Sequence, residues 1–376
     1  MKRPLKFLFL EPFYGGSHRD FADGLKAHSR HHIHLVTLPD RFWKWRMRGA
    51  AIYWSNRIDD PGQYDGLIVS SLLNLADLKA LWGSQCPPAL VYFHENQLTY
   101  PSSPQNRPDH QPGFTNIITA LTAERIVFNS HTHRRAFLAA LPDFVRSMPD
   151  FRPKWVTSAI EEKSTVAYPG CHFSTRLELE QRPTAQPPLI IWNHRWEHDK
   201  NPEAFFRALE TMIQKGIEFR VALMGEAYAR MPSAFEKAPH KLGRHLVQYG
   251  HLPQRRDYFQ WLDRGHVIIS TALQENFGIA VVEAIRHGCL CLLPDRLSYP
   301  EILPQKFHKD ALYSGQEDLE GKLARLLTGH ETHEARRREL AGAMGAYAWE
   351  HRIDQFDNEL EKLTDTIVID THAGLS

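Results

Sequence analysis

Two glutamates and two basic residues in the second half of the chain have the types and spacing to hold a phosphorylated sugar. Glu275 and Glu283 are separated by seven residues that include Gly278, and Arg195 and Lys200 lie about eighty residues upstream. A carboxylate beside a glycine turn can orient a hexose, and one further along the next helix can bind a ribose. Two cations can stabilise the negative charge that develops as a diphosphate leaves. Together these residues predict a glycosyltransferase that uses a nucleotide sugar.

The basic pair lies in the segment Trp192–Pro202, after a predicted strand and before a predicted helix. Backbone N–H groups at such a helix start favour anions. Arg195 can grip phosphate oxygens in a fork, and Lys200 adds a mobile point charge. A solvated charged loop is the alternative interpretation.

The acidic loop places Glu275, Asn276, Phe277 and Gly278 before an apolar helical stretch that contains Glu283. Gly278 permits close approach of a ligand to the backbone, and the helix start points partial positive charge at a phosphate. We expect all five residues to bind the donor. A helix cap plus a surface glutamate is the alternative, but a charge on an apolar stretch needs a partner.

A glycine turn follows the first predicted strand in the segment Glu11–His18. It is not the dinucleotide-binding fingerprint. We expect Gly15 and Gly16 to approach the donor, and Ser17 and His18 to contact the acceptor. A plain tight turn, with Ser17 as the N-cap of a helix, is an equal competitor.

The segment Tyr92–Pro101 concentrates polar side chains at the end of a buried strand, where an α/β sheet opens to its ligand. We expect His94 to contact the transferred sugar, and Glu95, Asn96 and Gln97 to contact the acceptor. A loop that satisfies its own backbone is the alternative.

The segment Arg41–Arg48 holds four cations, three aromatic residues and no acid. Aromatic rings can stack on bases while cations meet phosphates, so Trp43, Lys44 and Arg46 are predicted to contact RNA. An amphipathic helix with buried tryptophans and solvated arginines is the second interpretation, and the two are compatible.

Composition limits the remaining function classes. The net charge of +1 argues against a general nucleic-acid binder, and 42% apolar with 24% charged residues is ordinary for a globular protein. No apolar run has the length of a membrane span and no secretory cleavage site follows the start, so we expect a cytoplasmic protein without a membrane contact. The four cysteines form no metal pattern, and no Asp-x-Asp pair is present. We therefore expect catalysis without a metal or other cofactor.

Nearly continuous apolar runs alternate with helical patterns, which predicts parallel sheets covered on both faces and an α/β fold. We expect two doubly wound Rossmann-like domains facing a central cleft, with ligands at the carboxyl ends of the strands. A proline-rich stretch suggests residues 1–182 as the acceptor domain and 183–345 as the donor domain. Residues 346–376 are expected to form a C-terminal helix that crosses back. The predicted strands are Lys6–Leu10, Ile33–Thr37, Gly66–Ser71, Ala89–His94, Arg125–Asn129, Thr165–Tyr168, Leu189–Asn193, Phe219–Met224, Leu246–Tyr249, Val267–Thr271 and Leu290–Leu293.

The acid pair and the basic loop resemble those of the retaining glycosyltransferases of family four, which have the GT-B fold. The segments Leu10–His18 and Tyr92–Pro101 resemble the branch of that family that mannosylates queuosine in tRNA. The resemblance implies GDP-mannose as donor and the cyclopentene diol of queuosine in a tRNA anticodon loop as acceptor. It also implies catalytic roles for four residues: Glu275 at the hexose, Arg195 and Lys200 at the diphosphate, and His94 near the reacting carbon. Glu283 is implied at the ribose.

Two alternatives stay open from the residues alone. A GT-B sugar-nucleotide epimerase needs a similar donor site but no acceptor surface. A non-catalytic RNA-binding protein on the same scaffold needs the basic patch but not the acid pair. For the enzyme, we expect Glu275→Ala or Lys200→Ala to abolish transfer while leaving the fold intact.

Overall fold

The computed structural model describes residues 3–101, 109–179, 186–226, 231–329 and 333–373. The chain divides into two compact units. Unit 1 comprises residues 1–172 and 347–376, and unit 2 comprises residues 173–346. No helix among the described residues is long and apolar enough to cross a bilayer.

Unit 1 is built on a six-stranded sheet with the order β2-β1-β3-β4-β5-β6, in which every neighbouring pair is parallel. Its central strands are buried along their whole length because both faces are covered by helices, as the apolar runs predict. The strand β1 continues past the predicted Leu10 and pairs with β2 as far as Tyr14. The strands are β1 Lys6–Tyr14, β2 His32–Pro39, β3 Gly66–Ser70, β4 Ala89–Phe93, β5 Arg125–Phe128 and β6 Ser164–Val166.

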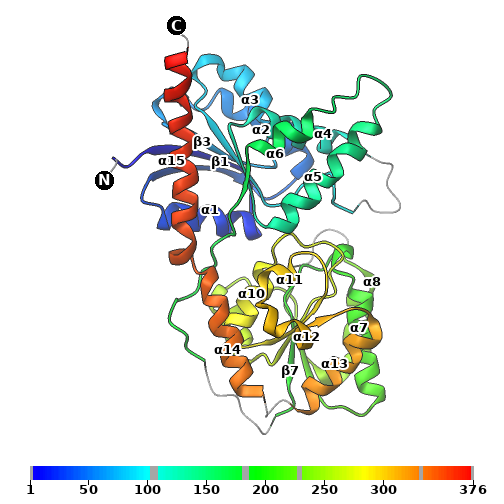
Figure 1. The fold of residues 1–376 in the computed structure, drawn as a ribbon. Helices are drawn as coiled ribbons and strands as arrows, with labels where there is room; N and C mark the ends of the chain where they lie inside the picture. The colour runs from blue at the N-terminus through cyan, green and yellow to red at the C-terminus, as the bar shows by residue number, and fades with distance from the viewer. Residues whose placement is uncertain (1–2, 102–108, 180–185, 227–230, 330–332, 374–376) are drawn as a thin grey trace. The chain divides into compact units, whose positions relative to one another are not determined.

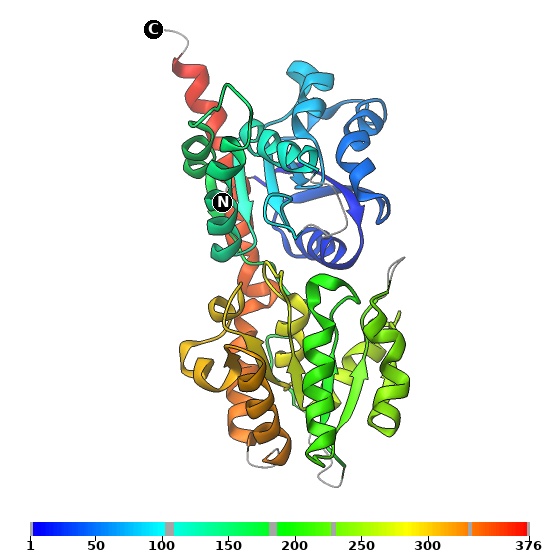
Figure 2. The same ribbon diagram turned by 90° about the vertical axis from the view of Figure 1, so that its right-hand side faces the viewer.

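Two helix layers cover this sheet (Figures 1 and 2). One layer, with α1 and α15, shares a core of Phe21, Tyr92 and Trp349 with the sheet. The other layer packs Trp54, Leu78 and Phe137 on the opposite face. The helices are α1 Gly16–His28, α2 Trp43–Ser55, α3 Leu75–Trp82, α4 Gln111–Thr122, α5 His131–Arg146, α6 Val156–Glu162 and α15 Trp349–Ala373, with short 3₁₀ turns η1 Pro61–Gln63 and η2 Gly83–Gln85.

The last helix belongs to unit 1. The chain re-enters this unit at Tyr347, and α15 packs against α1, β3 and β4. The indole of Trp349 is fully buried, and it lies where a Cβ on Gly24 or Gly170 would stand, so both glycines are required by packing.

The boundary between the units lies at His172, ten residues before the expected end of the first domain at residue 182. The reason is a contact that the sequence pattern does not show. Arg286 donates to the main-chain oxygens of Ser174 and Thr175 at 2.7 and 2.9 Å, which ties this stretch to unit 2. Much of the proline-rich linker, residues 180–185, lies outside the described residues.

Unit 2 has a second parallel six-stranded sheet, with the order β12-β11-β10-β7-β8-β9. The predicted strands are found, and the two-residue β12 is an addition. The strands are β7 Leu189–Trp192, β8 Arg220–Leu223, β9 Leu246–Tyr249, β10 Val267–Ile269, β11 Leu290–Pro294 and β12 Leu312–Tyr313. The helices are α7 Pro202–Gln214, α8 Ser233–Leu242, α9 Arg255–Arg264, α10 Ile279–Arg286, α11 Tyr299–Ile302, α12 His308–Ala311, α13 Gln316–Thr328 and α14 Glu334–Met344, with 3₁₀ turns η3 His198–Lys200, η4 Gly243–His245, η5 Gln305–Phe307 and η7 Gly345–Tyr347.

Candidate functional site

The Lys200 ammonium and the Glu275 carboxylate meet in unit 2, just beyond the carboxyl ends of β7 and β10. Only 8% of the Lys200 side chain is exposed, and its Nζ donates to the main-chain oxygen of Gln274 at 2.8 Å. The same Nζ lies 3.3 Å from Oε2 of Glu275 and 3.3 Å from Oδ2 of Asp199. The structure therefore brings together two predicted site residues that are separated along the chain by the elements from α7 to β10.

Arg195 is the more accessible cation of the pair. Its side chain is 47% exposed and forms an ion pair of 3.2 Å with Glu197. Burial raises the pKa of Glu197, although Arg195 opposes this effect. Burial would also raise the pKa of Glu275, but Lys200 and, more weakly, Arg195 hold it below its usual value. Glu275 is thus a carboxylate at neutral pH, able to accept hydrogen bonds from sugar hydroxyls.

The loop from Glu275 to Gly278 enters α10 through a left-handed glycine with φ of 99°. This conformation favours glycine, which explains Gly278 at this position. The Asn276 side chain accepts a hydrogen bond from Gln274 at 3.0 Å. Phe277 is only 2% exposed, so its ring packs in the interior of unit 2. The main-chain oxygen of Phe277 accepts a hydrogen bond from the Ser298 hydroxyl at 2.8 Å.

Glu283 is buried on α10 and has the charge partner that its apolar surroundings demand. Arg255 Nη2 donates to one carboxylate oxygen at 2.8 Å, and the Tyr258 hydroxyl donates to the other at 3.1 Å. Asn193 completes the arrangement by donating to the Tyr258 hydroxyl at 2.9 Å. The surface-glutamate alternative is therefore wrong, because Glu283 is a buried carboxylate with a cation and a hydroxyl as partners.

In unit 1, His18 lies between two carboxylates at the carboxyl ends of β1 and β4. Its Nδ1 is 3.2 Å from Glu11 and its Nε2 is 3.1 Å from Glu95, and the ring is 6% exposed. Burial alone would lower the pKa of His18, but Glu11 and Glu95 raise it to about 10. His18 is therefore a buried imidazolium, a role more specific than the acceptor contact expected from the sequence.

His94 stacks on His18 with ring centroids 4.0 Å apart. Burial, and then the cation on His18, put the pKa of His94 well below its usual value. His94 is thus neutral at physiological pH. A neutral imidazole beside a fixed imidazolium can exchange hydrogen bonds with a hydroxyl without adding a second charge.

The two glycines of the turn after β1, Gly15 and Gly16, are explained by different features of the structure. A Cβ on Gly15 would lie 2.1 Å from the Asp40 carboxylate, so packing inside the unit requires this glycine. Gly16 has φ of 49° and nothing within 4 Å of an added Cβ, which leaves its backbone open to a ligand. The N-cap of α1 is Gly15, so the N-cap interpretation of Ser17 is wrong, and Ser17 is exposed in the first turn.

One of the residues expected at the acceptor, Asn96, has a side chain that is engaged within its own loop. The Asn96 side chain is fully buried, and its oxygen accepts from the backbone of Leu98 and Thr99 at 3.0 Å each. The Gln97 N–H donates to Asn116 at 2.7 Å. Asn96 therefore shapes the loop, as the alternative of a loop that satisfies its own backbone describes. Of the three loop residues expected at the acceptor, Glu95 is the one that contacts His18.

The helix α2 exposes aromatic rings between its cations. Trp45 is 79% and Phe42 is 69% exposed, while Trp54 is buried in the core. Trp43 and Arg46 are half-buried, and exposed Lys44 forms a 2.9 Å ion pair with Asp109. The interpretation that this helix buries its tryptophans holds for Trp54 and is wrong for Trp45.

Comparison with known proteins assigns the chain to a family. Residues 6–171 match the family described as "tRNA-queuosine alpha-mannosyltransferase N-terminal", and residues 176–341 match "Glycosyl transferases group 1". A Drosophila melanogaster protein named tRNA-queuosine alpha-mannosyltransferase is 37% identical over 327 residues, which cover 84% of this chain and 85% of that protein. The chain belongs to the tRNA-queuosine alpha-mannosyltransferase family. It is a glycosyltransferase.

Solved structures show that the fold is GT-B. Sucrose-phosphate synthase from Thermosynechococcus elongatus is similar with a TM-score of 0.74 at 13% identity, over 96% of this chain and 100% of that one. Anabaena HepE, solved with UDP and glucose, is similar with a TM-score of 0.65 at 15% identity, over 95% and 100% of the two chains. The predicted fold class, two Rossmann-like α/β domains, is confirmed.

The cluster at the strand ends of unit 1 has residue types that bind metals. Ligand atoms of Glu11, His18 and His94 all lie within 4.8 Å of one another. However, the two rings are stacked and inclined by only 29°, so their in-plane lone pairs do not converge on one point. The two carboxylates on either side of His18 suit a proton on its ring better than they suit a shared ion. Catalysis without a metal stays a prediction.

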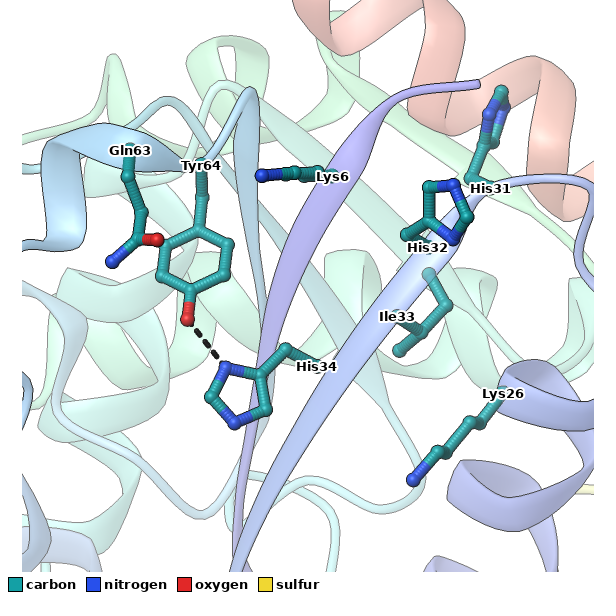
Figure 3. A pocket seen from close by; sticks show the side chains of 8 residues that line it. All are labelled: Lys6, Lys26, His31, His32, Ile33, His34, Gln63 and Tyr64. Carbon is teal, nitrogen blue, oxygen red and sulfur yellow. Dashed lines mark hydrogen bonds between the residues drawn. The ribbon is translucent and has the colours of Figure 1, made fainter.

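Two hollows in the surface lie away from these sites. One, of about 470 Å³, is lined by Lys6, Lys26, three histidines and Tyr64 (Figure 3). Lys6 and Tyr64 stand at or just before the amino ends of their strands, whereas the His18 cluster stands at the carboxyl ends. The other, of about 570 Å³, lies between Phe173–Leu179 and Arg286 in unit 2. Neither contains a predicted site residue, so cavity volume alone does not locate the chemistry.

Sequence reasoning missed the residues that hold the site in place. Arg255 and Tyr258 lie on α9, whose exposed and charged pattern resembles an ordinary surface helix. Asp199 lies beside Lys200 in the sequence, and its charge was a visible signal of local pairing. Glu11 was visible too, as an acid at the end of an apolar strand, where a buried charge needs a partner.

Proposed function

We propose that this protein transfers mannose from GDP-mannose to a hydroxyl of the cyclopentene diol of queuosine in a tRNA anticodon loop, with retention at the anomeric carbon. Membership of the family and the drosophilid relative's name support the donor sugar and the acceptor. The donor-site assignment rests on two glutamates that each form an ion pair with a cation: Glu275 with Lys200, and Glu283 with Arg255. We place the reaction in the cytoplasm, where tRNA is found.

The donor residues divide by charge. We assign Arg195 and Lys200, with the start of α10, to the diphosphate, because cations and helix N-termini stabilise phosphate charge. Glu275 accepts from hexose hydroxyls. Glu283 accepts from a ribose hydroxyl, held in place by Arg255 at 2.8 Å.

The acceptor residues are those of unit 1. We assign the sugar contact near the reacting carbon to the neutral imidazole of His94. The Glu95 carboxylate, fixed by the His18 imidazolium at 3.1 Å, accepts from a diol hydroxyl. The exposed rings and cations of α2 bind the RNA through stacking and phosphate contacts.

Chemistry proceeds by front-face attack in this proposal. The acceptor hydroxyl attacks the anomeric carbon from the leaving-group side, and its proton passes to a diphosphate oxygen as the glycosidic bond to GDP breaks. Protein groups position the reactants and stabilise charge, so the proposal needs no protein nucleophile and no metal.

The test is incubation with radiolabelled GDP-mannose and tRNA that carries queuosine. We expect label in the tRNA, and loss of boronate affinity, because glycosylation removes the free cis-diol. The matched control is the same tRNA with guanine in place of queuosine, which offers no diol. UDP-glucose in place of GDP-mannose tests the donor, and EDTA tests metal independence. Label in the guanine control, or turnover only with an added divalent cation, would contradict the assignment.

The two alternative functions, a sugar-nucleotide epimerase and a non-catalytic RNA-binding protein, are less well supported than the transferase. An epimerase would interconvert free GDP-sugars without RNA, which the same incubation detects by chromatography of the donor. A non-catalytic RNA-binding protein does not fit membership of a glycosyltransferase family.

A further inference from the structure

A second group of exposed aromatic and basic residues lies in unit 1, between α5 and α6. Phe151 is 94% exposed and Trp155 is 61% exposed. Arg152 and Lys154 are exposed between them, and Lys154 makes no ion pair within the part of the chain that the structure describes. We call residues 151–155 the Phe151 segment. It takes no part in the donor or acceptor assignments above.

The backbone of the Phe151 segment is strained where the ring is most exposed. Phe151 has φ of 44°, a left-handed conformation that L-residues adopt at a cost. No burial of the ring offsets this cost, since almost all of it faces solvent. Phe42, at the start of α2, repeats the combination, with φ of 57°, an exposed ring and a neighbouring arginine.

The Phe151 segment is anchored on both sides. Arg152 Nε donates to the main-chain oxygen of Met148 at 2.9 Å, and the Val156 N–H donates to Pro153 at 3.2 Å. Val156 is buried in the core beneath. The ring of Phe151 is therefore presented on a fixed backbone.

We call the exposed residues Phe42, Lys44 and Trp45 the α2 patch. This patch and the Phe151 segment belong to one side of the sheet. Trp54 of α2 and Val156 of α6 contribute to the same core, on the face opposite α1 and α15 (Figure 1). Both combine exposed rings with cations, which is the composition that binds unpaired nucleotides: rings stack on bases and cations meet phosphates. One acid, Asp150, precedes the segment and reduces its positive charge.

We propose that the Phe151 segment is a second RNA contact, in which an unpaired base stacks on Phe151 while Arg152 and Lys154 meet the neighbouring phosphates. The proposal rests on the proposed function only in taking that RNA to be the tRNA acceptor. It extends the RNA-binding surface from α2 to α6 on the same side of the sheet.

The decisive variant is Phe151→Gly in the full chain. Glycine accepts the left-handed backbone, so the midpoint of urea unfolding is expected to stay unchanged or rise. The Kd for a fluorescein-labelled anticodon stem-loop RNA, measured by anisotropy, is expected to weaken about tenfold, because a base–aromatic stack is lost. The matched control is Leu81→Ala on α3, a 53% exposed apolar residue, which should leave the Kd unchanged. An unchanged Kd in Phe151→Gly and Trp155→Ala would overturn the proposal.

A second measurement separates RNA contact from other roles. Lys154→Ala should reduce the slope of log K against log salt by about one, as loss of one phosphate contact does. With free queuosine nucleoside as acceptor, Phe151→Gly should keep its kcat/KM, while with tRNA kcat/KM should fall about tenfold. An equal loss with both acceptors, or a Phe151→Gly effect on self-association rather than on RNA, would refute the contact. Absence of transfer by the wild type would defeat the proposed function and leave the RNA-binding result standing.

Discussion

His18 should contribute stability that depends on pH in a specific window. Its pKa is raised from 6.5 to about 10 by Glu11 and Glu95, against the effect of burial. A group whose pKa is raised on folding contributes its full stability below the unfolded value and loses it as pH rises through the folded value. The contribution is therefore complete below about pH 6.5 and is lost by about pH 10. At 1.36 kcal/mol for each unit, a shift of this size corresponds to about 5 kcal/mol.

The perturbation is His18→Gln, which removes the cation and keeps most of the side-chain volume. Glu11 is fully buried, and its other oxygen already accepts from Phe13 N–H at 2.9 Å and Ser70 at 3.1 Å. Loss of the imidazolium leaves the oxygen that faced it without a counter-charge. We expect the free energy of unfolding of unit 1 to fall by about 3–5 kcal/mol at pH 6, as for a buried pair that has lost one partner.

The assay follows hydrogen exchange of the β1 and α1 amides between pH 6 and 9.5, since a chain of two compact units need not unfold in a single step. Wild-type protection, corrected for intrinsic exchange, should decrease across this window, and the His18→Gln profile should be flat. Selective ¹³C labelling of histidine rings gives the pKa directly, with the missing resonance in the variant as its assignment. A His18 ring that titrates at or below 6.5, or equal slopes for the two proteins, would refute the reasoning.

The remaining predictions concern the donor site. Lys200→Met should abolish transfer and also lower the melting temperature, because Glu275 would lose its nearest charge partner in a buried setting; this replaces the expectation that the fold stays intact. The double variant with Glu275→Gln should regain much of the melting temperature without regaining turnover. Glu283→Gln should raise KM for GDP-mannose about tenfold with a smaller effect on kcat, because the ribose contact is shared by the ground state and the transition state. Steady-state kinetics measures both constants, and an effect on kcat alone would contradict the assignment. Binding of GDP should be accompanied by proton uptake, because burial already raises the pKa of Glu197 and an incoming diphosphate adds negative charge beside it. Calorimetry in two buffers of different ionisation enthalpy measures this uptake, and equal heats in the two buffers would exclude it.

The sequence predicted the parts of the fold that depend on periodicity. Buried parallel strands produce continuous apolar runs, so the positions of β1 and β10 could be predicted from these runs, although β1 extends to Tyr14, past the predicted Leu10. The two-residue β12 carries too little pattern to be seen. Helix α10 was predicted from Gly278 and its apolar run. The left-handed entry explains the glycine, and burial of the helix explains the apolar run.

Partners across long sequence separations were not predictable. His18 and Glu95 are 77 residues apart, and only the strand order, with β3 between β1 and β4, brings them together. Glu283 demanded a partner by its apolar context, but nothing in the α9 pattern distinguished Arg255 from its exposed neighbour Arg256. A charged residue in an apolar run therefore predicts that an ion pair exists, but only the folded structure shows which residue is its partner.

The proposed function puts a diphosphate in a part of unit 2 where acids outnumber bases. Two cations, Arg195 and Lys200, share this region with three carboxylates, those of Glu197, Asp199 and Glu275. Before donor binding the balance is therefore negative by one, and net charge alone would repel a phosphate. Burial already raises the pKa of Glu197, and the negative charge of a bound diphosphate would raise it further, so we expect this carboxyl to take up a proton when the donor binds. Neutralising Glu197 releases Arg195 from its ion pair, and the freed guanidinium can then turn its fork to the diphosphate while Lys200 keeps Glu275 in place.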